Sequence, residues 1–143
     1  MTTLWHEVTQ GTEEWEQLRI GRITASEMHR LVTPTGKKRT GETPLTYALE
    51  LAAQRVCGWV DQRATGAAIE RGHRDEVLAR ELYREKVAPV DERGFASRGC
   101  IGYSPDGLVG DDGLIEIKSR IPRLQLETVA GVEVPSEHVI QVQ

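Results

Sequence analysis

The stretch that decides the fold of this chain begins with Ser104-Pro105-Asp106-Gly107-Leu108. After a short turn it continues with Leu114-Ile115-Glu116-Ile117-Lys118. Both segments are typical of short strands, and Asp111-Asp112-Gly113 between them is typical of a turn. Side chains alternate along a strand, so we expect Glu116 and Lys118 to share one face while the two isoleucines face the core. The sequence therefore predicts a hairpin that gathers charged side chains on one face.

This hairpin brings two carboxylates and an amine together. Asp106 ends the first strand, so folding at the turn places it beside Glu116. Carboxylate oxygens are the ligands that Mg²⁺ prefers, usually together with several waters. Lys118 can hold the attacking water and the scissile phosphate, and stabilise charge in the transition state. The motif alone leaves a second interpretation open, a solvated hairpin, because Asp, Glu and Lys are exposed by default.

The remaining sequence predicts helices before and after a small group of strands. The predicted helices cover residues 12–21, a short segment after 24–26, then 44–58, 66–86, and two segments after 122 that are broken around 131–135. Short strands are expected at 87–90, 99–104, 107–109 and 114–118. The 66–86 helix is expected to bury four apolar residues, namely Ile69, Val77, Leu78 and Leu82. Residues 33–43, which include Lys37-Lys38-Arg39, are expected to form an exposed loop. This order of elements indicates an α/β (α+β) class.

Length and composition indicate one folded domain spanning residues 1–143. A chain of 143 residues has room for a single modest core, and 38% hydrophobic with 28% charged residues is ordinary for a folded protein. Two cysteines without a CxxC pair make a disulfide framework or zinc knuckle improbable and favour a reducing cytoplasm. We find neither a signal peptide nor an apolar run near the roughly 20 residues of a membrane helix. The net charge of −4 argues against coating nucleic acid by bulk attraction, but not against a local basic groove.

Glu76, in the middle of the long predicted helix, is a candidate third acid. A glycine inside a helix costs about 1 kcal/mol relative to alanine. We therefore interpret Gly72 as a point of close backbone approach that brings Glu76 to the carboxylate pair. The alternative is a surface glutamate that pairs with Arg80 along the helix.

Polar residues near both ends of the chain are candidates for binding phosphate. Four of them gather around a predicted helix N-terminus, namely Arg19, Arg22, Thr24 and Ser26. Helix N-termini and arginines both suit an anion, and the alternative is an ordinary cap with solvated arginines. Gln141 and Gln143 could orient water or phosphate, or be plain surface glutamines. The helical pattern still runs at Gln143, which predicts a chain that is cut short at its C-terminus.

Taken in order, these motifs resemble the phage lambda exonuclease and YqaJ-type viral recombinase family of PD-(D/E)xK nucleases. The matching positions are Trp15, Arg19, Gly21, 23–27, 72–76, 104–108, 116–118 and 141–143. They cover nearly all of the chain with similar spacing. The resemblance implies a restriction-endonuclease-like core, a small mixed sheet flanked by helices. It also implies that a C-terminal strand and helix present in relatives are missing here.

The resemblance also implies an activity and the residues that perform it. The family digests one strand of double-stranded DNA 5′→3′ and leaves a 3′ single strand. Asp106, Glu116 and the Ile117 carbonyl resemble its ligands for Mg²⁺, with Mn²⁺ as a possible substitute. Glu76 resembles an acid that acts on the metal site through water. Lys118 resembles the residue that activates the nucleophilic water, and Gln143 its helper.

The substrate-binding residues follow from the same resemblance. Arg19 and Ser26 resemble the pair that grips the 5′-phosphate of the digested strand. Thr24, Ser104 and Gln141 complete the candidate set.

The implied partners are double-stranded DNA ends, a single-strand annealing protein and a homotrimer, with no membrane. The implied location is the cytoplasm, that of a host cell if the chain is phage-encoded. Two alternatives stay open. One is another PD-(D/E)xK nuclease, either a site-specific endonuclease or a single-strand exonuclease. The other is a non-catalytic fragment that holds DNA ends.

Overall fold

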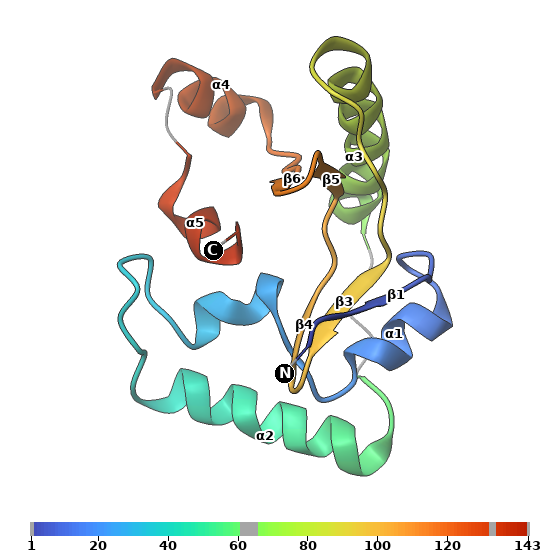
Figure 1. Cartoon of the computed structure of the whole chain (residues 1–143). Helices are drawn as coiled ribbons and strands as arrows, with labels where there is room; N and C mark the ends of the chain where they lie inside the picture. Colours follow the sequence, from blue (N-terminus) through green and yellow to red (C-terminus); the bar gives the residue numbers. More distant parts are fainter. Residues whose placement is uncertain (1, 61–65, 132–133, 143) are drawn as a thin grey trace. The chain divides into compact units, whose positions relative to one another are not determined.

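The computed structural model describes residues 2–60, 66–131 and 134–142, in two compact units (Figure 1). The first, here called the sheet unit, comprises Met1–Asp61, Gly94–Ser104 and Val134–Gln143. The second, the hairpin unit, comprises Gln62–Arg93 and Pro105–Glu133. That residues 1–143 act as a single nuclease domain stays a prediction. In the part of the chain that the structure describes, no helix is both long enough and apolar enough to span a membrane.

A four-stranded mixed sheet forms the centre of the sheet unit. Its strands are β1 (Leu4–His6), β2 (Ile23–Thr24), β3 (Phe95–Arg98) and β4 (Ile101–Tyr103), in the order β1-β3-β4-β2. The β1–β3 and β3–β4 pairs are antiparallel, and β2 runs parallel to β4. The predicted mixed sheet is confirmed, but of its four strands only β4 was predicted. The strand expected at 87–90 is wrong: these residues lie outside every strand, and Pro89 has no N–H to donate to a ladder.

The core of the sheet unit is built around Phe95, whose side chain is completely buried. Gly102 on the neighbouring strand lies under its ring, so closely that a Cβ at this position would lie 2.2 Å from Phe95 Cζ. His6 Nε2 lies 2.8 Å from Ser97 Oγ, which links β1 to β3 by side chains as well as by backbone. The sheet can therefore be this tight because one of its central positions has no side chain.

Four helices belong to the sheet unit: α1 (Glu13–Arg19), η1 (Ala25–Arg30), α2 (Glu42–Cys57) and α5 (Ser136–Val142). Thr12 caps α1 by accepting a hydrogen bond from the Trp15 N–H, which agrees with the helix predicted from residue 12. The segment after Thr24 is a 3₁₀ helix, and α5 packs against it. Helix α2 begins at Glu42, two residues before Pro44, and ends at Gly58 as predicted, where φ is 75°.

Helix α2 attaches to the sheet unit through polar contacts rather than through an apolar stripe. The leucines at 45 and 49 and Val56 are 61%, 63% and 86% exposed, whereas Tyr47 is buried. Gln54 accepts a hydrogen bond from the Gly21 N–H at 3.0 Å, and Arg55 donates to the Gly21 carbonyl at 2.9 and 2.6 Å. The apolar residues that recur at helical spacing along α2 therefore do not lie on its inward face.

The basic loop is more ordered than the sequence suggested. Val32 and Lys38 form an isolated antiparallel bridge, and the Thr33 N–H donates to the Lys37 carbonyl at 2.8 Å. Arg39 donates its backbone N–H to Leu31 and its Nε–H to the carbonyl of His29. The loop is exposed, as predicted, but it is closed into a small hairpin.

The hairpin unit consists of α3 (Ala67–Lys86), β5 (Gly107–Val109), β6 (Gly113–Ile115) and α4 (Pro122–Gly131). Strands β5 and β6 pair antiparallel with the register Gly107↔Ile115 and Val109↔Gly113, as the turn predicted. Strand β6 ends at Ile115, so the strand expected to continue to Lys118 is too long. Asp91 bridges Leu108 on the other edge of β5.

Helix α3 turns its charged face inward, which contradicts the predicted burial of four apolar residues. Ile69, Val77, Leu78 and Leu82 are 47%, 55%, 68% and 57% exposed. The half-buried positions are Arg71, Gly72, Asp75, Glu76, Ala79, Arg80, Tyr83 and Arg84, which recur at helical spacing. Charged residues can face inward here because each is ion-paired or hydrogen-bonded within the unit.

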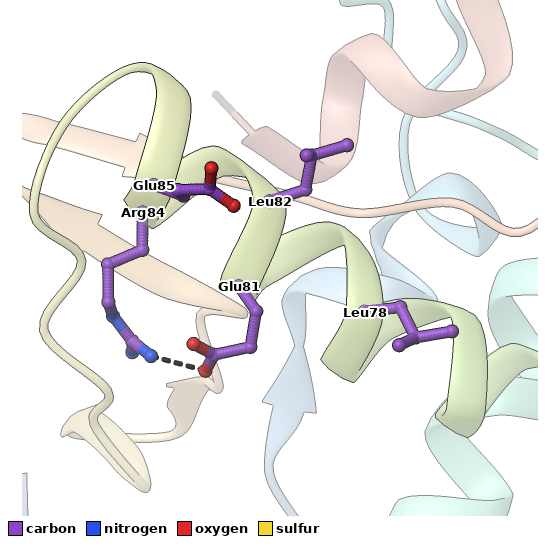
Figure 2. Close-up of a pocket in the computed structure, with 5 residues that line it drawn as sticks. All are labelled: Leu78, Glu81, Leu82, Arg84 and Glu85. Atoms are coloured by element: carbon purple, nitrogen blue, oxygen red, sulfur yellow. Dashed lines mark hydrogen bonds and ion pairs between the residues drawn. The ribbon is translucent and has the colours of Figure 1, made fainter.

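The outer face of α3 carries a hollow of about 490 Å³ (Figure 2). It is lined by residues of α3 alone, namely Leu78, Glu81, Leu82, Arg84 and Glu85. None of the candidate site residues lines it. The interpretation of Gly72 as a close backbone contact is also wrong, because a Cβ there would meet nothing within 4 Å.

Replacing Gly102 by alanine tests the tight contact below Phe95. The added Cβ would clash with the ring, so we expect Gly102→Ala to lower the free energy of unfolding by about 1–3 kcal/mol. Gly72→Ala is the matched control, because its Cβ enters open space within a helix and should stabilise the protein by about 0.5–1 kcal/mol. Urea unfolding followed by circular dichroism measures both. Equal effects of the two substitutions would contradict the packing described here.

Candidate active site

The β5–β6 hairpin brings Asp106 and the segment after β6 side by side. Continuing the register Gly107↔Ile115 by one pair places Asp106 opposite Glu116. The backbone N–H of Ile117 donates to Asp106 Oδ2 at 2.5 Å. Only the register of the hairpin sets this contact, so a shift by one residue would separate the two acids.

Glu116 and Lys118 meet, although they lie beyond the end of β6. Lys118 Nζ lies 2.5 Å from Glu116 Oε1. The Glu116 side chain is 9% exposed and the Lys118 side chain is 36% exposed. The lysine therefore reaches a nearly buried carboxylate from the solvent side.

Glu76 joins this group electrostatically. Burial raises the pKa of Glu76, and the negative charge of Asp106 raises it further. Arg80 opposes the shift, since its guanidinium is ion-paired with Glu76. Glu76 therefore pairs with Arg80, as the alternative interpretation expected, but it is half-buried rather than a surface residue. Its role at the carboxylate pair stays a prediction.

The ionised form of the Asp106 side chain is disfavoured in the folded protein. Burial raises its pKa, and the Ile117 N–H, Lys118 and Arg80 only partly oppose the shift. Burial thus disfavours the ionised form of Asp106, and burial together with the charge of Asp106 disfavours that of Glu76. That is the electrostatic condition under which an added cation is stabilising.

Three residues that sequence reasoning did not select hold the cluster in place. Arg80 bonds both Glu76 and Glu92, which joins α3 to the segment before β3. Ser119 donates to Asp75 Oδ2 at 2.5 Å, which fastens the residue after Lys118 to the same helix. The signal for Arg80 in the sequence was its spacing of four residues from Glu76, which places both on one face of the helix.

The donor set fits a hard divalent ion, although it is not arranged as a finished metal centre. Among the residues that the structure describes, no group of three His, Cys, Asp or Glu side chains is positioned to hold a metal. The oxygens of Asp106, of Glu116 and of the Ile117 carbonyl are the type that Mg²⁺ binds. The raised pKa values of Asp106 and Glu76 are the independent observation in favour of the fit.

A second cluster lies in the sheet unit, around Trp15. The Arg19 guanidinium lies over the Trp15 ring at 4.2 Å from its centroid, and the Trp15 indole N–H donates to Ser104 Oγ at 2.8 Å. Thr24 is buried, and its hydroxyl oxygen lies 3.3 Å from that of Ser26. Thr24 pairs with Gly102 on β4, the strand that leads to Ser104. Four of the substrate-binding candidates are therefore brought to one end of the β2–β4 pair.

The remaining candidate residues of this region make other contacts or lie elsewhere. Arg22 donates to the carbonyl of Leu18 in α1, so it is bound to the preceding helix rather than solvated. Thr24 makes no side-chain hydrogen bond to cap η1, so the ordinary-cap interpretation is wrong. Gln141 lies on α5, which packs against the helix of Ser26. Gln143 lies outside the described residues.

Comparison with known proteins gives the family. Residues 14–143 match the YqaJ-like viral recombinase domain family. The chain belongs to this family. A comparison with curated proteins found no match.

Solved structures agree with this family and with the mixed α/β fold. An alkaline exonuclease from Laribacter hongkongensis, LHK-Exo, is 35% identical with a TM-score of 0.77, over 91% of this chain and 64% of that one. LHK-Exo in complex with dAMP gives 36% identity and a TM-score of 0.77, over 92% of this chain and 65% of that one. This YqaJ-family chain is thus homologous to a nuclease, and it spans a little under two thirds of the LHK-Exo chain.

The raised pKa of Asp106 predicts how stability depends on pH. A carboxyl whose folded-state pKa is raised contributes stability below its unfolded pKa, and this contribution is lost as the pH rises through the folded pKa. Asp106→Asn keeps an oxygen to accept the Ile117 N–H but cannot ionise. We therefore expect Asp106→Asn to melt at a higher temperature than the parent at pH 7 without divalent metal. The difference should vanish near pH 4, about the ordinary pKa of aspartate. A variant that melts lower at pH 7 would contradict this electrostatic account.

Proposed function

We propose that this chain carries the site of a metal-dependent deoxyribonuclease that hydrolyses duplex DNA from a 5′-phosphorylated end. Digestion runs 5′→3′ and leaves a 3′ single strand for recombination. The observation that carries the proposal is the hairpin that holds Asp106 opposite Glu116, with Lys118 on Glu116, in a chain homologous to an alkaline exonuclease.

Mg²⁺ is the proposed cofactor, with Mn²⁺ as a substitute. Asp106, Glu116 and the Ile117 carbonyl would hold it, and Glu76 would act through water. Such an ion lowers the pKa of bound water and stabilises charge on the phosphate. Binding it would also favour the ionised forms of Glu76 and Asp106, whose pKa values burial raises.

The protein's own groups position the reacting atoms. Lys118 holds the nucleophilic water and donates to the scissile phosphate, because its ammonium already lies at the edge of the carboxylate group. Gln143 is proposed as its helper from the family resemblance alone. Asp75 and Ser119 keep the Lys118 segment on α3, and Arg80 holds Glu76 by an ion pair.

The 5′-phosphate is bound by the sheet unit in this proposal. Arg19 supplies a guanidinium, which can donate two hydrogen bonds to one phosphate. Thr24, Ser26, Ser104 and Gln141 supply neutral donors. The LHK-Exo complex shows that relative holding dAMP, a nucleoside monophosphate of the kind that exonucleolytic digestion releases. A homotrimer and an annealing partner are further proposals that rest on the family resemblance.

The proposal can be tested by comparing activity on DNA that has a 5′-phosphorylated end with activity on DNA that has no end. With Mg²⁺ or Mn²⁺, we expect digestion of 5′-phosphorylated linear duplex and no cleavage of a covalently closed circle. Lys118→Ala and Glu116→Ala should each lower the rate by about 10²–10³-fold, because each removes a group that acts in the transition state. Lys86→Ala and Glu85→Ala are matched controls, because these residues form an exposed ion pair with each other. Gel assays of labelled duplex measure all four.

The outcomes separate the alternatives. Cleavage of the closed circle would identify an endonuclease, and cleavage of single strands alone a single-strand exonuclease. Binding of DNA ends without metal-dependent cleavage would identify a non-catalytic fragment.

Metal binding can be tested without any substrate. An ion that binds only the folded protein stabilises it in proportion to the logarithm of its concentration. We expect Mg²⁺ to raise the melting temperature by several degrees at concentrations well above its dissociation constant. Glu116→Gln should remove most of this shift, while Glu85→Gln should keep it. An equal shift in all three proteins would show that the ion binds elsewhere.

A further inference from the structure

We infer that Glu92 is a positioning residue of the proposed metal site, because it holds Arg80 and, through Arg80, the carboxylate of Glu76. The inference rests on the proposed function and deepens it, since it names a residue that controls how tightly the same site binds Mg²⁺. Two observations carry it: a series of ion pairs that begins at Glu76, and backbone contacts that fix the segment of Glu92.

Glu92 belongs to a series of alternating charges that leads from the site along α3. The Arg80 guanidinium is ion-paired through Nη2 with Glu76 and through Nη1 with Glu92. The other oxygen of Glu92 lies 2.9 Å from Arg84 Nη2, and Arg84 is ion-paired in turn with Glu81. Of these five residues Glu92 alone lies outside α3. It therefore holds the Arg80 guanidinium from outside the helix.

The backbone next to Glu92 is fixed to strand β5. Asp91 and Leu108 exchange two backbone hydrogen bonds, 2.9 and 2.8 Å long. Val90 is buried against Gly107, so closely that a Cβ on this glycine would lie 2.2 Å from Val90 Cγ1. Glu92 thus extends to α3 from a backbone that is anchored on the β5–β6 hairpin. It joins the helix that carries one candidate acid to the hairpin that carries the other two.

Burial makes Arg80 depend on this partner. Its side chain is 12% exposed, so water cannot readily replace an acceptor that is lost. The hydrogen bond from Arg84 and the charge of Arg80 hold the pKa of Glu92 below its ordinary value, so Glu92 is a carboxylate that serves two guanidiniums.

The divided guanidinium leaves part of Glu76 available to the metal site. Only one oxygen of Glu76, Oε1, is paired with Arg80, because the other Nη group of Arg80 is held by Glu92. Without Glu92, Arg80 can turn both Nη groups to Glu76, since a guanidinium binds a carboxylate readily in this bidentate way. A carboxylate whose two oxygens are so occupied is a poorer acceptor for water bound to Mg²⁺. Glu92 thereby preserves the metal-binding capacity of Glu76.

Substitutions of Glu92 separate positioning from an effect of charge alone. Glu92→Gln keeps the size of the side chain but has a single oxygen, so it cannot accept from both arginines as the carboxylate does. Glu92→Asp keeps the charge but is one methylene shorter, so it cannot reach both arginines. Glu81→Gln is the matched control, because Glu81 pairs with Arg84 at the end of the series remote from Glu76. Circular dichroism and thermal melts in EDTA check that each variant is folded.

The measurement is the dissociation constant for Mg²⁺, obtained without DNA from the rise of the melting temperature with Mg²⁺ concentration. Residues that orient a metal ligand typically change metal affinity by about 10–100-fold. We expect Glu92→Gln to weaken Mg²⁺ binding about tenfold, and Glu92→Asp about threefold to tenfold, because Glu92 acts through Arg80. Glu81→Gln should stay within about twofold of the parent. In a Glu76→Gln background, Glu92→Gln should have little effect, because Glu92 acts through Glu76.

The loss in Glu92→Gln relative to the parent should persist in about 1 M KCl, where the Debye length is about 3 Å and exposed charges no longer act at a distance. An unchanged Mg²⁺ affinity in Glu92→Gln would overturn the inference and leave the proposed nuclease standing. A loss that Glu92→Asp does not share, or that disappears at high salt, would also overturn it, since it would indicate a general effect of charge. Failure of the proposed metal site is seen separately in the parent protein, as a melting temperature that does not rise with Mg²⁺, and it would overturn both proposals.

Discussion

One hydrogen bond, from the backbone of Ile117 to the carboxylate of Asp106, determines how the candidate active site is arranged. A half-buried carboxylate needs a donor, and a main-chain N–H supplies one without adding a side chain to the site. The contact exists only in the register that the Gly110-Asp111-Asp112 turn imposes. The same register sets Glu116 opposite Asp106 and carries Lys118 to the edge of the pair. The hairpin register and this backbone contact together set the positions of the three candidate site residues.

The second constraint is electrostatic and explains the unusual orientation of α3. A helix beside two acids must supply cations on its inner face, or leave the acids uncompensated. Arg80 meets part of this requirement, because it is ion-paired with Glu76 and its charge lowers the pKa of Asp106. The apolar residues of the helix are then left on the outer face, where Leu78 and Leu82 border the hollow of Figure 2. The inner face of α3 therefore carries its ion-paired charges, and the apolar side chains lie on the outer face.

Sequence predicts well those parts of the fold that are determined by residues close together in the chain. The hairpin follows from a turn and two adjacent strands, and α1 follows from the Thr12 cap. Strand β1 could not be found this way, because Leu4–His6 is stabilised only by pairing with residues 95–97. The orientation of α3 was predicted wrongly for a related reason. Its ion-pair partner Glu92 and the acid Asp106 lie far along the chain, and periodicity carries no information about them.

The small hairpin that contains Lys37-Lys38-Arg39 has a consequence for encounters with polyanions. Flexible basic segments lose conformational entropy when they are immobilised against a charged partner. Here the Val32–Lys38 bridge and the bonds of Arg39 to residues 29 and 31 have already imposed that order. The loop therefore presents its positive charge from a preorganised backbone, so that less of the electrostatic attraction is offset by ordering the chain.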